Sequence, residues 1–183
     1  LSRIYSAELE GINAKLIEVE VDLNVGLHSF NIVGLADKAL NEAKERVSSA
    51  LKNSGFKPPT KENRKITINL APADIKKTGS QYDLAIAVGY LLATEQIREF
   101  PPADKIFIGE LALNGEVRPV PGALNTALLA REVKLKYLFL PRDNAPEASL
   151  IKGVEVIPIT TLSDLVNHLS AAKFIPPHQP AEF

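Results

Sequence analysis

The pattern of apolar and polar positions is clearest between Lys65 and Ala93, where an alternating segment leads through a polar loop into an almost wholly apolar one. Residues 65–70 alternate polar and apolar side chains and include β-branched residues, which predicts a half-buried strand. From Gln81 to Leu92, apolar side chains recur on every side. Because a helix without a polar face is normally buried, we expect this helix to pack in the centre of the domain, against the sheet.

The start of this helix has two interpretations. Ser80 stands three residues before Asp83, the spacing of a capping box. Its hydroxyl is therefore expected to accept a hydrogen bond from the first turn, while Asp83 offsets the positive end of the helix dipole. A serine at the mouth of a buried helix also fits a catalytic nucleophile, and this alternative stays open at the level of spacing.

The first third of the chain predicts three strands and a helix. The strands cover residues 3–14, 15–23 and 29–33, and the second alternates acidic with apolar side chains. A helix of about 18 residues begins near Asp37 and ends at Gly55. Lys38, Glu42 and Arg46 follow one another at i, i+4, so we expect them to form exposed ion pairs on the outer face of this helix.

The second half predicts strands that alternate with helices. The expected elements are a strand at 105–113, a hairpin return at 116–118 after Asn114-Gly115, a helix from Gly122, strands at 137–140 and 154–159 with a short helix between them, and a last helix at 161–172 capped by Thr161 or Ser163. The two short apolar strands are typical of strands covered on both faces. The whole order predicts one mixed sheet with packed helices, an α+β domain of βαβ character in its second half.

Length and composition limit the class of protein. A chain of 183 residues supports one domain, which we place at residues 1–172, and the Pro-rich residues 173–183 look like the start of a linker. The net charge of −1 excludes a uniformly basic nucleic-acid binder. Absent cysteine excludes disulfides and thiolate sites, and the three histidines have no metal-ligand spacing, so no metal site is expected. The sequence has no apolar run long enough for a membrane span, and a cytoplasmic location is expected.

Residues 52–65 form the most basic window, with five basic residues against one acid. A solvated loop is one interpretation. The other is a contact with phosphates, because several cations can hold nucleic acid without reading its sequence. The candidate DNA-binding residues are Lys52, Lys57, Lys61, Arg64 and Lys65, with Lys76 and Lys77 at the head of the central helix. The acidic strand face with Glu18, Glu20 and Asp22 would repel phosphate, so binding is expected on one side only.

Motifs for catalysis are weak. The chain contains neither a phosphate-binding loop nor a dinucleotide fingerprint. The acid pairs Glu8 and Glu10, and Glu18 and Glu20, are expected to lie on exposed strand faces as solvated charge rather than as general acids or bases.

Three long motifs together carry a family resemblance: GLADKALNEAKERVSSAL (34–51), INLAPADIKKTGSQYDLAIAVG (68–89) and GELALNGEVRPVPGAL (109–124). They closely resemble the N-terminal domain of the magnesium-chelatase-like AAA+ ATPases, the ComM/YifB family, over almost all of residues 1–172. The resemblance implies the fold of ribosomal protein S5 domain 2, which is shared with the proteolytic domain of Lon and the C-terminal domain of bacterial RadA. It also implies that the chain continues into an ATPase core of a hexameric motor.

Lon-like peptidases use a serine in a D-G-P-S-A-G loop and a lysine soon after a P-x-G-G turn. Matched to that pattern, Gln81 takes the place of the serine, and Ser80 is one position away. The lysine falls at Leu124 or Asn125, depending on a one-residue ambiguity. Neither can act as the base of a Ser-Lys pair, so the resemblance implies a domain without peptidase activity.

The resemblance therefore implies a non-catalytic domain that assists DNA binding and ring assembly in branch migration or recombination, as in natural transformation. Its expected partners are DNA, its own ATPase core and neighbouring subunits of a ring. ATP and magnesium are expected only in the ATPase core, and no cofactor in this domain. The alternatives are a protein-interaction or regulatory module of a chelatase- or chaperone-type ATPase, and a Lon-like serine peptidase.

Overall fold

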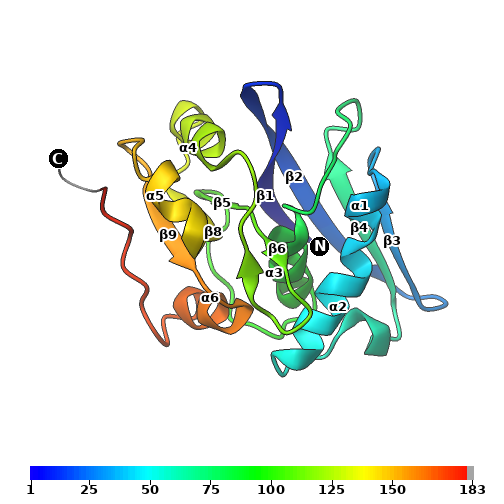
Figure 1. Ribbon diagram of the computed structural model, residues 1–183. Coiled ribbons are helices and arrows are strands. Elements are labelled where there is room, and N and C mark those ends of the chain that lie inside the picture. Colours follow the sequence, from blue (N-terminus) through cyan, green and yellow to red (C-terminus); the bar gives the residue numbers. More distant parts are fainter. Residues whose placement is uncertain (181–183) are drawn as a thin grey trace.

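The computed structural model describes residues 1–180, which fold around a seven-stranded sheet of order β3-β4-β2-β1-β5-β8-β9 (Figure 1). Within this sheet β2 runs antiparallel to both its neighbours, β1 and β4, whereas the other neighbouring strands pair in parallel. The predicted mixed sheet is therefore confirmed. Because it is mostly parallel and its second half alternates strands with helices, the class is α/β rather than the expected α+β.

The elements of the main sheet and its helices have the following bounds. The strands are β1 (Ser2–Glu10), β2 (Asn13–Asn24), β3 (Ser29–Val33), β4 (Lys65–Ala71), β5 (Lys105–Phe107), β8 (Tyr137–Pro141) and β9 (Glu155–Ile159). The helices are α1 (Lys38–Asn41), α2 (Ala43–Asn53), α3 (Asp83–Ala93), α4 (Ala123–Glu132), α5 (Ala145–Ala148) and α6 (Leu162–Leu169), with 3-10 turns at Pro59–Lys61 and Arg142–Asn144.

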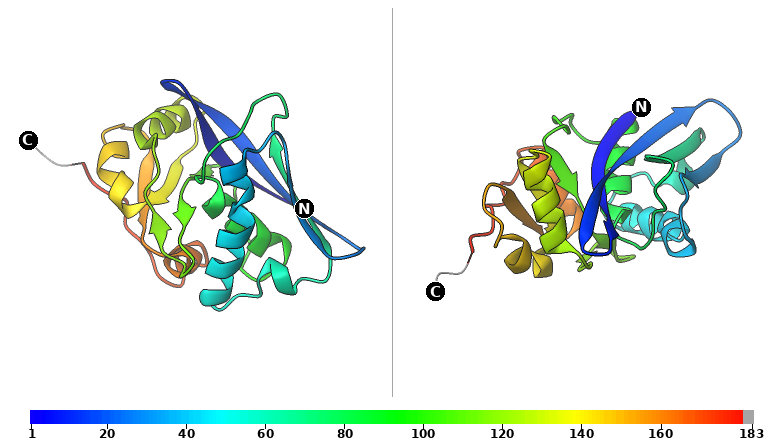
Figure 2. Two further views of the ribbon diagram at one scale, coloured as in Figure 1. Left: turned by 45° about the vertical axis from the view of Figure 1, so that its right-hand side comes forward. Right: turned by 90° about the horizontal axis from the view of Figure 1, so that it is seen from above.

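Helices cover both faces of the sheet (Figure 2). α2, α3 and α6 share one apolar cluster with alternate strand residues such as Val19, Ile68 and Phe139. α4 and α5 share a second cluster with residues of the opposite face, such as Ile106 and Leu138. β8 contributes to both clusters, which confirms the prediction of a strand covered on both faces. α3 is buried on nearly all sides, as its apolar pattern predicts.

Two strand predictions need correction. The first hairpin turns at Gly11 and Ile12, because β1 and β2 pair from Glu10↔Asn13 onward, so the predicted boundary at Ala14 is too late. The strand expected at 105–113 divides at Gly109. β5 stays in the main sheet, while β6 (Glu110–Leu111) and β7 (Val117–Arg118) form a separate two-stranded sheet.

The helix predicted from Asp37 is two helices, α1 and α2, divided at Glu42. Asp37 caps α1, because its side chain accepts a hydrogen bond from the amide of Leu40 at 2.8 Å. The ambiguity at the last helix is also resolved, since Thr161 accepts from the amide of Asp164 at 3.1 Å. The capping box at Ser80 is wrong: α3 begins at Asp83, and its N-cap Tyr82 makes no side-chain capping hydrogen bond.

The C-terminal segment lies against the domain over its described residues, 173–180. The amide of His178 donates to the carbonyl of Val156 at 2.7 Å, and the amide of Ile175 donates to His168 Nδ1 at 2.9 Å. Ile175 packs against the first apolar cluster. The start of the predicted linker is thus attached to β9 and α6, whereas residues 181–183 lie outside the described residues.

Candidate functional site

The three sequence motifs meet at the N-terminus of α3. Asp83, which is fully buried there, accepts from Arg46 Nε at 2.6 Å, from Arg46 Nη2 at 3.0 Å and from the amide of Leu111 at 3.0 Å. Arg46 also donates to the carbonyl of Ala39. The prediction that Arg46 lies on the outer face is therefore wrong: the side chain turns inward, and Glu42 lies only at 4.0 Å from it.

The ion pair is charged in spite of its burial. Burial raises the pKa of Asp83 to about 6, although the hydrogen bonds and the charge of Arg46 lower it. The hydrogen bond with Asp83 raises the pKa of Arg46 in turn. Both groups remain ionised at neutral pH, so the bidentate pair fixes α2, α3 and β6 relative to one another.

The prediction that Glu8 on β1 lies on an exposed strand face is wrong. Its side chain is 3% exposed, not solvated. Its carboxylate accepts four hydrogen bonds, from Thr78 N at 2.9 Å, Thr78 Oγ1 at 2.7 Å, Tyr82 Oη at 2.6 Å and Gln81 Nε2 at 3.4 Å. These donors satisfy a buried charge. Glu10, the other member of the pair, is exposed as predicted.

A small cavity of about 140 Å³ lies beside Glu8, and Gln81 and Thr126 also line it. Gln81, which the resemblance matches to the lost serine, is thus one of the residues that line this cavity. Leu124 and Asn125 do not line this cavity: the amide of Leu124 approaches Glu147 at 3.4 Å, and the side chain of Asn125 donates to the carbonyl of Ile12. Ser80 is not among the lining residues either, so this cavity brings together no nucleophile and base of the Ser-Lys kind.

Lys77 does not lie where the DNA-binding hypothesis needs it. Its side chain is fully buried, and its ammonium group donates to the carbonyl of Pro72. Burial lowers its pKa. The backbone of Lys77 pairs with the segment before α1, through the amide of Asp37 and the carbonyl of Leu35. Lys77 therefore joins two motifs and is not available to a phosphate.

The basic segment, residues 52–65, divides into paired and free cations. Arg64 Nε lies 2.9 Å from Glu62 Oε1, and Lys57 Nζ lies 3.5 Å from Glu62 Oε2. The hydrogen bond with Arg64 lowers the pKa of Glu62 to about 2. Among the described residues, Lys52, Lys61 and Lys65 are exposed and make no salt bridge.

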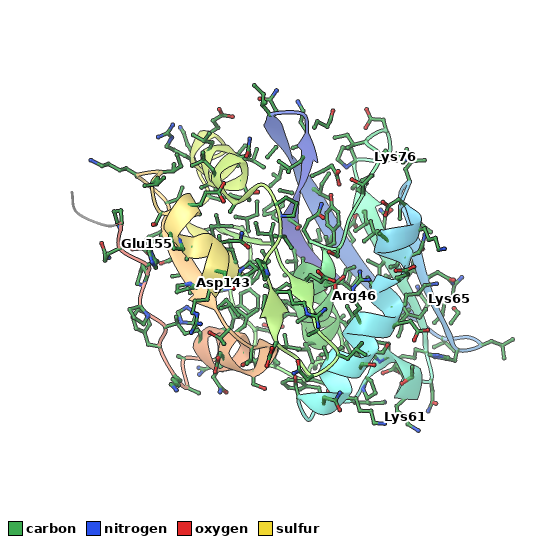
Figure 3. All side chains as sticks on the ribbon, viewed as in Figure 1. Arg46, Lys61, Lys65, Lys76, Asp143 and Glu155 are labelled. Atoms are coloured by element: carbon green, nitrogen blue, oxygen red, sulfur yellow. The ribbon has the colours of Figure 1, made fainter. Side chains whose placement is uncertain are left out.

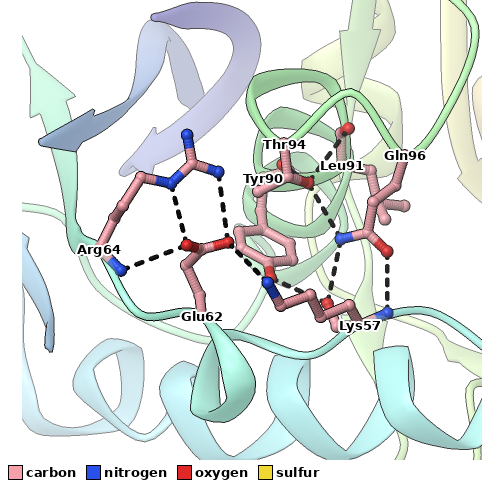
Figure 4. Close-up of polar contacts among 7 residues, drawn as sticks. All are labelled: Lys57, Glu62, Arg64, Tyr90, Leu91, Thr94 and Gln96. Carbon is pink, nitrogen blue, oxygen red and sulfur yellow. Dashed lines mark hydrogen bonds and ion pairs between the residues drawn. The ribbon is translucent and has the colours of Figure 1, made fainter. Parts of the chain in front are cut away.

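The segment is held firmly to the C-terminal end of α3 (Figure 4). Tyr90 Oη donates to the carbonyl of Lys57 at 2.8 Å, and Gln96 exchanges two hydrogen bonds with the backbone of Lys57. The segment also contains a 3-10 turn, which begins at Pro59. The free lysines are thus carried on an ordered surface.

Lys76 is exposed but belongs to a different place. Lys65 begins β4 and Lys76 lies in the loop after its other end, so the length of the strand, about 20 Å, lies between the two loops. Figure 3 shows Lys76 and Lys61 at opposite ends of the molecule. The structure therefore does not join the two basic loops into one patch. The acidic face of β2 is also less repulsive than expected, since Arg3 lies 3.2 Å from Glu18 and 3.6 Å from Glu20.

Other kinds of site find little support in residues 1–180. No three acidic or histidine side chains of this part gather as metal ligands. In the described chain, no helix has the length and apolar character that a membrane span requires. The functional signals that the sequence reasoning missed are Glu8 and Glu62. Glu62 is the single acid of the basic window in the sequence, but only the structure shows that it pairs with Lys57 and Arg64.

The chain is similar in sequence to known proteins over most of its length. Residues 19–144 match the family model described as subunit ChlI of Mg-chelatase. The chain is 40% identical over 176 residues to competence protein ComM of Haemophilus influenzae, covering 96% of this chain and 34% of that protein. It is 43% identical over 153 residues to the uncharacterized protein YifB of Escherichia coli, covering 84% and 29%.

A more distant similarity reaches the Lon proteases. The Lon protease of Azospirillum brasilense is 24% identical over 168 residues, with 86% of this chain and 20% of that protein covered. The chain spans about a third of the length of the first two relatives. The family-model match covers more than half of the chain, so the chain belongs to the Mg-chelatase ChlI family, as a ComM/YifB-like domain.

Proposed function

We propose that this chain is the non-catalytic N-terminal domain of a Mg-chelatase-like AAA+ ATPase and that it helps hold DNA during branch migration or recombination. The fold proposed for it is that of ribosomal protein S5 domain 2. The observation that carries the DNA contact is the group of three exposed, unpaired lysines, Lys52, Lys61 and Lys65. We call these three residues the basic surface.

The basic surface suits a phosphate backbone for two reasons. Its cations come from the end of α2, the 3-10 turn and the start of β4, so three elements contribute exposed charge to it. Because they are not neutralised by carboxylates, they can release counterions when phosphates bind. Lys57 and Arg64 contribute less, since Glu62 holds both. Such binding is indifferent to base sequence.

The remaining expectations follow from the same family membership. ATP and magnesium would bind in the ATPase core, in the rest of a longer cytoplasmic protein, and the domain would contact that core and neighbouring subunits of a ring. We propose that the isolated domain associates weakly, because the ATPase modules would supply the main ring contacts. Sedimentation of this chain as a tight hexamer at micromolar concentration would contradict that.

Peptidase and ATPase activity are not expected of residues 1–183. The cavity beside Glu8 holds Gln81 and Thr126 and lacks a base of the lysine kind. A serine-reactive probe tests the first point: labelling that disappears in Ser80→Ala would revive the Lon-like peptidase. Steady ATP hydrolysis by pure protein would contradict the second.

The DNA contact is tested by reversing the charge of the basic surface. The triple variant Lys52→Glu, Lys61→Glu, Lys65→Glu should lose duplex binding at moderate salt. For the unchanged protein, log K should fall against log salt with a slope of about −3, one for each phosphate neutralised. Each single lysine removed should flatten the slope by about one. Fluorescence anisotropy with a labelled duplex measures both.

A matched control carries the same change of net charge elsewhere. Lys134, Lys152 and Lys173 are exposed and lie outside the basic surface, so their reversal should leave most of the binding intact. If both triple variants bind DNA like the unchanged protein, the basic surface is not the contact. The alternative is then a protein-interaction module, for which the exposed Leu35, 57% exposed beside the junction of two motifs, is the better starting point.

A further inference from the structure

We propose that the loop between β2 and β3, together with the hollow beside it, binds unpaired bases, so that the DNA held by this domain is single-stranded or locally opened. This inference rests on the proposed DNA contact of the basic surface and names its substrate class. Two observations carry it: an aliphatic loop tip that is almost fully exposed, and a hollow that combines an aromatic side chain with hydroxyl groups and lysines.

The loop tip exposes apolar side chains next to a free cation. Val25 is 97% exposed and Leu27 is 94% exposed. The loop projects beyond the sheet at the right of Figure 1. Both its ends lie beside Lys65, which is in register with Asn24 on one side and with Ser29 on the other. Apolar side chains on a cationic arm can enter between base steps and unstack them.

The hollow lies between α2 and the start of β3 and has a volume of about 380 Å³. Phe30, three residues after Leu27, lines it as a half-buried aromatic side chain that also packs against the first apolar cluster. Lys44 and Lys52 line it from α2, and they are separated by about 12 Å along the helix. Lys44 thus adds a second cation on this side, outside the basic surface.

The remaining lining groups suit the edge of a base. Ser49 and Thr60 bring hydroxyl groups that can donate or accept, and Glu45 brings a carboxylate that can accept from an amino group. Recognition of single strands combines these parts: a base stacks on an aromatic side chain while cations follow the phosphates. We therefore expect the hollow to prefer unpaired bases, because their faces are free to stack on an aromatic side chain.

The loop tip alone does not distinguish DNA from an anionic membrane, because exposed aliphatic residues beside lysines also suit a lipid surface. The hollow favours DNA. An aromatic side chain bordered by hydroxyl groups is a site for a flat polar ring, and a bilayer surface has no such group to place there.

The test compares three ligands of similar length: a dT20 strand, an abasic strand with the same phosphates, and a 20-base-pair duplex. We expect dT20 to bind about tenfold more tightly than the abasic strand, the order expected for stacking of a base on an aromatic side chain. Phe30→Leu should remove that preference and leave the abasic affinity unchanged. Phe30→Tyr, which keeps the aromatic face, should retain it.

A second variant does not depend on the packing of Phe30. Val25→Ser with Leu27→Ser changes exposed residues, so it should fold normally. We expect the unchanged protein to raise 2-aminopurine fluorescence at a fork, and this double variant should abolish that rise. Normal behaviour of this variant and of Phe30→Leu, with loss of binding on reversal of the basic surface, would overturn the base site while keeping the DNA contact. Absence of DNA binding by the unchanged protein would overturn both. Sedimentation with phosphatidylserine vesicles that needs Val25 and Leu27, without DNA binding, would assign the loop to membranes.

Discussion

Arg46 on α2 donates two hydrogen bonds to the buried carboxylate of Asp83 at the start of α3, with Nε to Oδ2 at 2.6 Å and Nη2 to Oδ1 at 3.0 Å. The pair joins residues 37 positions apart in the sequence. Asp83 is fully buried, whereas the Arg46 side chain is 16% exposed. Since the carboxylate also receives the amide of Leu111, one buried group holds all three family motifs together.

Removal of the arginine should therefore destabilise the domain strongly. Arg46→Met leaves a buried carboxylate without its cation, and we expect a loss of about 3–5 kcal/mol in the free energy of unfolding. Urea unfolding followed by circular dichroism measures it. The double variant Arg46→Met, Asp83→Asn removes the uncompensated charge and keeps an acceptor for Leu111, so it should recover part of the loss.

The stability of the single variant Arg46→Met should depend on pH differently from that of the unchanged protein. In Arg46→Met only the hydrogen bond from the amide of Leu111 still opposes the effect of burial, so the pKa of Asp83 should rise above the value of about 6 that it has with the arginine present. Because the pKa of Asp83 is raised in the folded state, the cost of burying its ionised carboxylate is fully present above that pKa. This cost is lost as the pH falls from the folded-state pKa toward the ordinary value of 3.8. The stability gap between the variant and the unchanged protein should narrow from pH 8 to pH 5. A gap independent of pH would show that lost packing, not charge, is the cause.

Glu8 should contribute strongly to stability, although Glu10, two residues away on the same strand, is an exposed acid. Glu8→Ala leaves the buried hydroxyl of Tyr82 without its acceptor and removes the acceptor of the part-buried amide of Thr78. We expect a loss of about 3 kcal/mol, since each unsatisfied donor costs about 1–3 kcal/mol. Glu10→Ala is the matched control on the same strand and should change stability by less than about 0.5 kcal/mol. Equal effects of the two variants would contradict the buried hydrogen-bond network.

Protonation of Glu62 at acid pH should lower the stability of the domain. Its pKa in the folded state is about 2, mainly because of the hydrogen bond with Arg64, and lies below the ordinary value of 4.5. The stabilising contribution is present above about pH 4.5 and is lost as the pH falls toward 2. Water screens the half-exposed Arg64 and Lys57, so we expect about 1 kcal/mol. The Tm measured between pH 2.5 and 6 should therefore change less with pH for Glu62→Gln than for the unchanged protein.

Glu62→Gln should also strengthen the proposed DNA contact. The substitution frees Lys57 and Arg64, so duplex affinity should rise and the salt slope should steepen by up to about two. Asn63→Ala, an exposed neutral neighbour, is the control. Unchanged affinity and slope in Glu62→Gln would mean that DNA does not approach this part of the basic segment.

The sequence by itself determined the elements whose signal is local. Residues 29–33 form β3 as predicted, because alternation and turn residues are visible within a few positions. The apolar pattern of α3 predicted burial on all sides for the same reason. The free lysines of the basic segment were also found from sequence, since charge density is a local property, as was the family resemblance carried by three long motifs.

Tertiary structure decided which side chains are surface and which are core. Arg46, Glu8 and Lys77 all resemble surface residues in sequence, yet each side chain turns inward. Arg46 and Glu8 turn to partners outside their own elements, Asp83 for Arg46 and Thr78 and Tyr82 for Glu8, whereas Lys77 turns to the carbonyl of Pro72 in its own loop. A charged residue is buried only where donors or acceptors compensate for its lost hydration. The Arg46 and Glu8 partners lie far away in the chain, 37 residues from Arg46 and 70 from Glu8. No local pattern contains that information, because it arises only when the strands and helices come together.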